Sequence, residues 1–171
     1  MNSRLHITVL ALTLALLAAS CREVPVIDAT QPKGDTLREN MIGANRIIAH
    51  SEEQQIDSYA TRHGWHMQRL AGGTRVMVTR HGQGGKVDYE DTVTLHYRVE
   101  NLAGQTIYDS IEETVVAGRL KPVRGIDAAL RTLTRGSQAR VILPSEQAYG
   151  VVGDADRIGS RMVLVYFLEV D

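Results

Sequence analysis

Cysteine, tryptophan and phenylalanine are scarce in this sequence. Its 171 residues include one cysteine, one tryptophan and one phenylalanine, beside six tyrosines. Because Cys21 has no second cysteine to pair with, an intramolecular disulfide is excluded. The formal net charge is −1, and basic residues are mixed with acidic ones without forming a basic stripe. This charge pattern argues against a nucleic-acid partner.

Only one long apolar run occurs, and it lies near the first residue. The run from Ile7 to Ala19 follows Arg4, an order that is typical of a secretory signal. It is too short for a stable membrane-spanning helix. Small residues then precede the cysteine, and Leu17-Ala18-Ala19-Ser20-Cys21 resembles the bacterial lipobox. We therefore expect residues 1–20 to be a lipoprotein signal peptide and lipidated Cys21 to hold the protein on a membrane.

The segments that follow the cysteine predict a tether and then helices. Residues 21–34 contain prolines and show no periodicity, which predicts a tether. Residues 35–70 predict an N-terminal helical region with two short amphipathic helices, the second capped by Ser51. Such helices cannot bury their apolar faces alone. They could pack on the following domain, on each other or on a second copy of the chain, so a homodimer through them is an open alternative.

Residues 122–150 form the most informative stretch of the chain. Ile126, Ala129, Leu130 and Leu133 recur with helical spacing, and Gly136 follows where a helix would end. Residues 138–143 then alternate in the manner of a strand that Pro144 stops. Further strands are predicted at 65–70, 74–80, 92–99, 106–109, 115–117 and 162–170. The last of these is apolar on both faces, which favours a central position in a sheet.

The order and spacing of several segments resemble the FKBP-type peptidyl-prolyl cis-trans isomerases. The matching segments are Asp91 to Tyr97, Gly104 to Ser110, Val123 to Ile126, Gly136 to Pro144, Ala148 to Gly150, and the closing strand with Leu168 and Glu169. The resemblance implies an α+β fold over residues 71–171, a curved antiparallel sheet of about five strands wrapped around one short helix, with the two short N-terminal helices before it. The lipobox and helical region are similar to the gliding-motility-associated branch of bacterial FKBP-type lipoproteins.

The resemblance also implies a set of site residues, carried over position by position. The proline ring of a substrate would lie against walls and a floor formed by Tyr97, Tyr108, Val123, Ile126 and Tyr166. The Val123 backbone N–H and the Tyr149 hydroxyl would donate to substrate carbonyls, Asp109 would supply a carboxylate at the rim, and Ile158 would cover the site. Of these residues, Tyr97, Asp109 and Tyr149 are the catalytic candidates.

Several positions depart from the pattern of the family, among them Pro122, which stands where an aliphatic residue with an amide N–H is usual. Ile126 stands where tryptophan is common, Glu113 where an aromatic residue is frequent, and Arg157 where an apolar residue is usual. These changes predict a shallower and wetter pocket.

The sequence also predicts no cofactor and no metal. Residues 154–159 resemble the start of a calcium loop, but Ile158 and Val165 would occupy two ligand positions and offer no side-chain ligand. His63 and His66 have no acidic or cysteine partner at metal-ligand spacing.

The sequence therefore leads to one main expectation and two alternatives. The first is a peptidyl-prolyl cis-trans isomerase that acts on proline-containing polypeptides in the cell envelope of a bacterium, facing the periplasm or the cell surface. The second is a chaperone or a binding module of a surface assembly with the same fold and little or no isomerase activity. The third is a purely structural lipoprotein.

Overall fold

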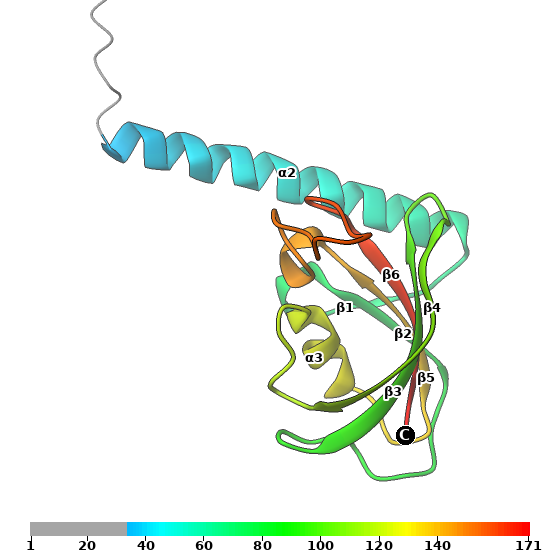
Figure 1. The fold of residues 1–171 in the computed structure, drawn as a ribbon. Helices are drawn as coiled ribbons and strands as arrows, with labels where there is room; N and C mark the ends of the chain where they lie inside the picture. The colour runs from blue at the N-terminus through cyan, green and yellow to red at the C-terminus, as the bar shows by residue number, and fades with distance from the viewer. Residues whose placement is uncertain (1–33) are drawn as a thin grey trace, which may run out of the picture. The chain divides into compact units, whose positions relative to one another are not determined.

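The computed structural model describes residues 34–171 (Figure 1). The signal peptide predicted at residues 1–20, the lipidated Cys21 and the tether up to residue 33 lie outside the described residues. Residues 40–171 form one compact unit, and the packing described below belongs to that unit. Residues 34–39 are the first residues of a helix and belong to a separate unit.

Two helices and six strands make up the described fold. In chain order they are α2 (Gly34–Arg62), β1 (Gln68–Arg69), β2 (Arg75–Arg80), β3 (Thr92–Asn101), β4 (Thr106–Val116), α3 (Arg124–Leu130), β5 (Gln138–Leu143) and β6 (Leu164–Val170). The strands form one antiparallel sheet in the order β1-β2-β5-β6-β3-β4. The predicted α+β fold, a curved antiparallel sheet around one short helix, is confirmed, and the sheet has six strands where about five were expected.

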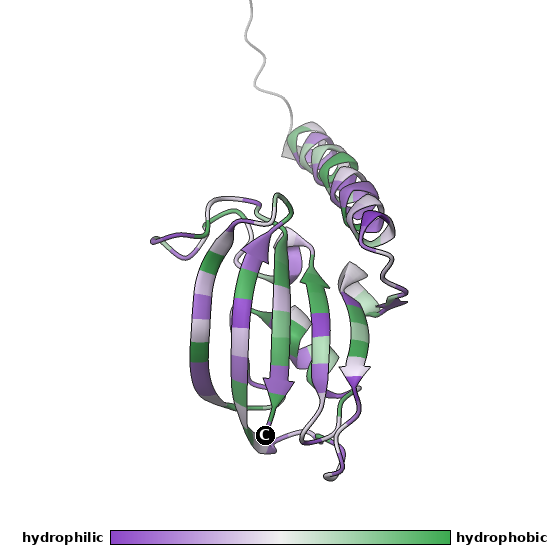
Figure 2. Cartoon of the chain, turned by 90° about the vertical axis from the view of Figure 1, so that its right-hand side faces the viewer, coloured by the Kyte–Doolittle hydropathy of each residue, from purple (hydrophilic) through white to green (hydrophobic). Residues whose placement is uncertain are grey.

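The short helix α3 packs against one face of the sheet and builds the main core there. Its residues Ile126, Ala129 and Leu130 are buried together with Val141 and Leu143 of β5. The apolar spacing that predicted this helix is the face that enters the core. Figure 2 shows hydrophobic and hydrophilic bands alternating along the strands, as expected where successive side chains point to opposite faces.

The opposite face of the sheet carries a second, smaller core formed with helix α2. Ile56 and Tyr59 of α2 are buried against Ile142 of β5 and Val165 of β6. This contact explains why the closing strand is apolar on both faces: β6 lies between β5 and β3 and is covered on each side. The prediction of a central closing strand is confirmed.

Helix α2 is one continuous helix of 29 residues, in place of the two short helices that the sequence suggested. Ser51, the expected N-cap, lies within it, and its hydroxyl accepts a hydrogen bond from the Gln55 side chain 3.2 Å away. Glutamate and glutamine dominate the turn from Glu52 to Gln55, and neither proline nor glycine interrupts it. Because these residues lose little rotamer freedom in a helix, the backbone continues through the expected break.

Charged side chains fasten α2 to the first strands. The guanidinium of Arg75 on β2 donates to the Asp57 carboxylate at 2.8 Å and to the Gly73 carbonyl at 2.7 Å, and its side chain is only 7% exposed. Glu53 accepts from both Arg69 and Arg75. Hydrogen bonds on several sides satisfy the buried Arg75 charge, which would otherwise be costly to desolvate.

Strand β4 is continuous where the sequence predicted two short strands. It contains a bulge, because Val99 of β3 pairs with Tyr108 and Tyr97 pairs with Ile111. Between these pairs β3 has only Arg98, whereas β4 has both Asp109 and Ser110, and Ser110 adopts a positive φ of 55°. A bulge of this kind bends the strand and re-aims the side chains on either side of it.

Neither a membrane span nor a metal cluster is found in the described part of the chain. Among residues 34–171, no helix combines the length and apolar character needed to cross a bilayer. Within the same range, no three His, Cys, Asp or Glu side chains are grouped so that they could hold a metal ion.

Candidate functional site

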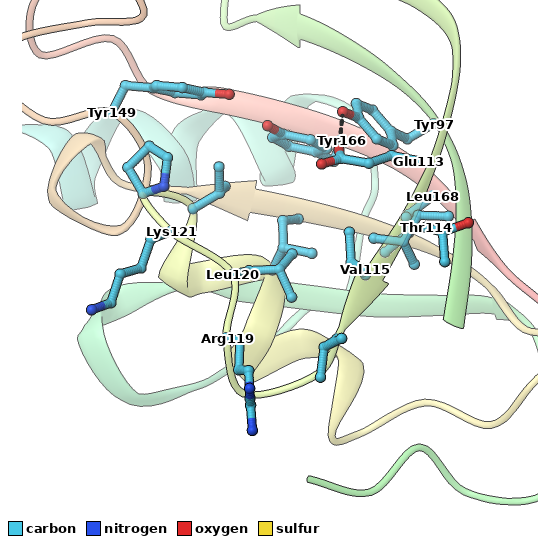
Figure 3. Close-up of a pocket in the computed structure, with 15 residues that line it drawn as sticks. Tyr97, Glu113, Thr114, Val115, Arg119, Leu120, Lys121, Tyr149, Tyr166 and Leu168 are labelled. Atoms are coloured by element: carbon cyan, nitrogen blue, oxygen red, sulfur yellow. Dashed lines mark hydrogen bonds between the residues drawn. The ribbon is translucent and has the colours of Figure 1, made fainter. Parts of the chain in front are cut away.

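A cavity of about 370 Å³ lies between the sheet, helix α3 and the loop that joins β4 to α3. Figure 3 shows its lining, with the tyrosine rings along one side and Leu120 and Val115 along the other. Five of the residues predicted for the site meet here: Tyr97, Val123, Ile126, Tyr149 and Tyr166. They come from β3, the α3 N-terminus, the loop after β5, and β6, so only the folded chain brings them together.

Tyr97 and Tyr166 form one wall of the cavity. They lie on the neighbouring strands β3 and β6, and their ring centroids are 5.4 Å apart. Tyr166 is only 4% exposed. Burial raises the pKa of Tyr166, and it also raises the pKa of Tyr149. Both hydroxyls are therefore protonated at neutral pH and can donate hydrogen bonds into the cavity.

The floor and one further donor come from the start of α3. Ile126 lines the cavity and is 2% exposed, so its side chain contributes apolar surface to the site. Val123 immediately precedes the helix, and its carbonyl accepts from the Ile126 N–H. Within the described chain, the Val123 N–H donates to no backbone carbonyl. A helix N-terminus leaves such N–H groups available to a ligand.

Glu113 lines the site, although in the sequence it stood out only as a departure from the family pattern, where an aromatic residue is frequent. It lines the cavity, and its Oε2 accepts a hydrogen bond from the Tyr97 hydroxyl at 2.9 Å (Figure 3). Burial and this hydrogen bond raise the pKa of Tyr97. Because the Tyr97 hydroxyl donates to Glu113, the tyrosine hydroxyls of the lining that donate to no group among residues 34–171 are those of Tyr149 and Tyr166.

The structure does not place Asp109 with the other catalytic candidates. Asp109 is exposed in the β4 bulge and lines a groove on the opposite sheet face, beside His96 and Arg98. The extra residue in the bulge changes the alternation of side chains along β4. As a result Tyr108 and Glu113 lie on the cavity side of the strand, while Asp109 does not.

Tyr108 and Ile158 lie next to the cavity and are absent from its lining. The Tyr108 hydroxyl donates to the Asp154 carboxylate in the loop before β6, and this bond raises the pKa of Tyr108 to about 12. Ile158 is 3% exposed and belongs to the main core. Both residues therefore hold residues 154–160 in place, the segment called the covering loop below, and neither forms part of the cavity surface in this structure.

Asp154 organises the covering loop. Its Oδ1 accepts hydrogen bonds from the backbone N–H groups of Asp156, Arg157 and Ile158 at 2.8 to 3.0 Å. Burial by itself would raise the pKa of Asp154, but the Tyr108 hydroxyl and these backbone donors outweigh it and lower the value to about 2. The acidic pattern that resembled a calcium loop thus has a local role, in which one carboxylate satisfies three backbone donors.

The site can bind a small apolar group and hold the carbonyls next to it. The apolar residues Leu95, Val115, Leu120 and Ile126 line the space. Tyr149 and Tyr166 bring their hydroxyls to it, and Val123 also belongs to its lining. Apolar walls with a few placed polar groups are typical of ligand sites. A proline ring with its flanking amide groups has this combination of shape and polarity.

Comparison with known proteins agrees with this geometry. The chain is 32% identical over 104 residues to a probable FKBP-type 25 kDa peptidyl-prolyl cis-trans isomerase from Pseudomonas aeruginosa, a match that covers 61% of this chain and 45% of that protein. It is 28% identical over 103 residues to a probable FKBP-type peptidyl-prolyl cis-trans isomerase, FkpA, from Neisseria meningitidis, covering 58% of this chain and 38% of that one. The chain thus spans less than half the length of these curated relatives.

A solved structure shares the fold. The crystal structure of a peptidyl-prolyl cis-trans isomerase from Pseudomonas syringae pv. tomato matches with a TM-score of 0.62 and 24% identity, over 73% of this chain and 92% of that one. At this identity the likeness shows the fold alone. The family model described as FKBP-type peptidyl-prolyl cis-trans isomerase matches residues 84–171, which include every residue that lines the cavity. The resemblance seen in the sequence is confirmed, and the chain belongs to the FKBP-type peptidyl-prolyl cis-trans isomerase family.

Proposed function

We propose that this protein is a peptidyl-prolyl cis-trans isomerase that assists the folding of exported polypeptides while a lipid anchor at Cys21 holds it outside the cytoplasm. The observation that carries the catalytic part is the cavity itself, in which Tyr97, Tyr149 and Tyr166 surround an apolar floor at Ile126. Family membership supports the same reaction class.

The chemistry of the reaction fits such a cavity. Rotation about a peptide bond must cross a barrier of about 18–20 kcal/mol, because amide resonance is lost on twisting. For X-Pro bonds the uncatalysed step takes tens to hundreds of seconds, which is slow enough to limit folding. The twisted amide has less charge separation than either planar form, so a site that excludes water stabilises it relative to the planar amide. This is selective binding of the transition state, and it requires no nucleophile.

The polar groups position the substrate. A proline ring resting on Ile126 would place its flanking carbonyls where the Tyr149 hydroxyl and the Val123 N–H can donate to them. Each donor restricts one carbonyl, so rotation is confined to the bond between them.

An isomerisation assay tests the catalytic proposal. The purified protein is mixed with a short proline peptide, and the return to cis-trans equilibrium is followed with time. We expect the rate to rise in proportion to protein concentration. A folded sample that leaves the rate at its background value would refute the enzyme and favour the chaperone or binding module, which the polar Glu113 in the cavity wall also supports.

The anchor is supported by the sequence before Cys21 and needs its own test. We expect wild-type protein expressed in a bacterium to sediment with membranes and to incorporate a labelled fatty acid. Cys21→Ser should abolish the labelling and release the protein. If the variant stayed with the membrane, the lipobox assignment and the proposed location in the cell envelope would fall.

Pairing of two copies through the N-terminal helix is a further part of the proposal. Met41, Ile42 and Ile47 of α2 are at least half exposed, and apolar side chains in such positions support contact with another surface. Sedimentation velocity over a range of concentrations distinguishes a dimer from a monomer. A mass that stays monomeric at every concentration would refute the proposed dimerisation through α2.

A further inference from the structure

Within the lining of the cavity, Glu113 is the only acidic residue, and its position suggests a preference for substrates of one charge. It extends from β4 beside the rings of Tyr97 and Tyr166 (Figure 3). Its Oε2 is engaged by the Tyr97 hydroxyl at 2.9 Å, whereas Oε1 accepts no hydrogen bond from residues 34–171. One carboxylate oxygen therefore remains available to a ligand.

The two cations of the lining do not neutralise Glu113. Arg119 pairs with Glu90 at 2.5 Å, and it points away from the tyrosines in Figure 3. The Lys121 ammonium also points away from Glu113 in that view. Both lie on the loop between β4 and α3, across the cavity from the tyrosine wall. A polypeptide over the tyrosine wall would therefore meet the negative charge of Glu113 first.

A bound polypeptide would remove part of the water around this carboxylate. Covering a charged group without a partner is costly, whereas an opposite charge nearby offsets the loss of water. An aspartate or glutamate in the substrate would add repulsion between like charges. The same pocket should thus distinguish substrates that differ only in the charge of the residue next to proline.

We propose that Glu113 makes this site selective for polypeptides with a lysine or arginine next to the proline, and that it disfavours those with an aspartate or glutamate there. This inference rests on the proposed isomerase function, because it assigns a substrate class to the same cavity. Since Glu113 is exposed to solvent before the substrate binds, the expected preference is moderate, about threefold to tenfold between the lysine and glutamate peptides.

A matched set of peptides and variants tests the proposal. Peptides that differ only in lysine, leucine or glutamate before proline are compared in the isomerisation assay and, separately, for binding by calorimetry at low ionic strength. Glu113→Gln removes the charge and retains an oxygen that can accept from Tyr97. Glu112→Gln is the control, because Glu112 is the next residue of β4 and faces the groove on the other side of the sheet.

We expect wild type and Glu112→Gln to prefer the lysine peptide over the glutamate peptide, and Glu113→Gln to bring the two within about twofold of each other. About 1 M salt should weaken the wild-type preference, since it shortens the Debye length to about 3 Å. Isomerisation of all three peptides by wild type without charge preference would overturn the role of Glu113 and leave the isomerase intact. Binding with the expected charge preference but without isomerisation would overturn the isomerase and retain the role of Glu113. Failure of every peptide both to isomerise and to bind would overturn the two proposals together.

Discussion

The Glu52 carboxylate of helix α2 accepts two hydrogen bonds from Ser145, one from its hydroxyl at 2.6 Å and one from its backbone N–H at 2.9 Å. Both residues are buried, Glu52 at 7% and Ser145 at 1% exposure. The Ser145 carbonyl in turn accepts from the N–H groups of Ala148 and Gly150, which flank Tyr149. A helix outside the region matched by the family model thus holds the turn that carries a residue of the cavity.

Glu52→Ala should therefore weaken the fold and the site together. Ser145 would keep two buried donors without an acceptor, and each unsatisfied donor costs about 1–3 kcal/mol. We expect the free energy of unfolding in urea to fall by about 2–4 kcal/mol. The control is Gln54→Ala, which truncates an exposed side chain two residues away on the same helix and should change this free energy by about 0.5 kcal/mol or less. Equal losses in the two variants would contradict the role assigned to the buried carboxylate.

Tyr149→Phe should lower catalysis while leaving the fold intact. The change removes one hydroxyl donor and keeps the ring, so the expected loss in kcat/KM is about threefold to tenfold, equivalent to one hydrogen bond. Tyr97→Ala should behave differently, because removing a half-buried ring should cost about 2–3 kcal/mol of unfolding free energy as well as activity. Isomerisation rates and urea denaturation of both variants separate the two effects. Parallel losses of stability and activity in the two would count against this division.

The covering loop should become less stable in acid because of Asp154. Its pKa is lowered from 3.8 to about 2 in the folded protein, so the ionised form stabilises the fold above pH 3.8. That stabilisation is lost as the pH falls through about 2, when the carboxylate is protonated. Asp154→Asn lacks this titration, so its unfolding free energy should fall less steeply over that window than that of the wild type. Urea denaturation at a series of pH values gives the comparison. Parallel plots of unfolding free energy against pH for the two proteins would refute the role assigned to Asp154.

Two isoleucines of α2 provide a test of the second core. Ile56 is fully buried against the sheet, whereas Ile47 is 72% exposed. Ile56→Ala should lower the unfolding free energy by about 2–4 kcal/mol, because it removes buried methyl groups and leaves a cavity. Ile47→Ala should change it by about 0.5 kcal/mol or less. If thermal or urea denaturation gave the two variants the same stability, α2 would not be packed on the sheet as described.

Local sequence patterns predicted the elements of this fold well where burial follows a regular period. The alternation at 92–99 became β3, and the helical spacing of Ile126, Ala129 and Leu130 became α3. The central position of β6 followed from its two apolar faces. Tyr97, Tyr149, Tyr166 and Ile126 came together as the resemblance implied. For the strands and the helix, the pattern of apolar side chains itself selects the backbone geometry that buries them. The meeting of the site residues was implied by the family resemblance alone.

The chain by itself thus determined most of the strands and the short helix, since each depends on residues that are close in sequence, whereas Tyr97 and Tyr166 meet only because β3 pairs with β6. Tertiary structure decided which carboxylate reaches the cavity. The bulge opposite Arg98 turns Asp109 outward and Glu113 inward, and it exists only because β4 pairs with β3 in this register. Register is a relation between distant segments, and a shift of one residue moves side chains to the other face, so single-strand patterns do not reveal it.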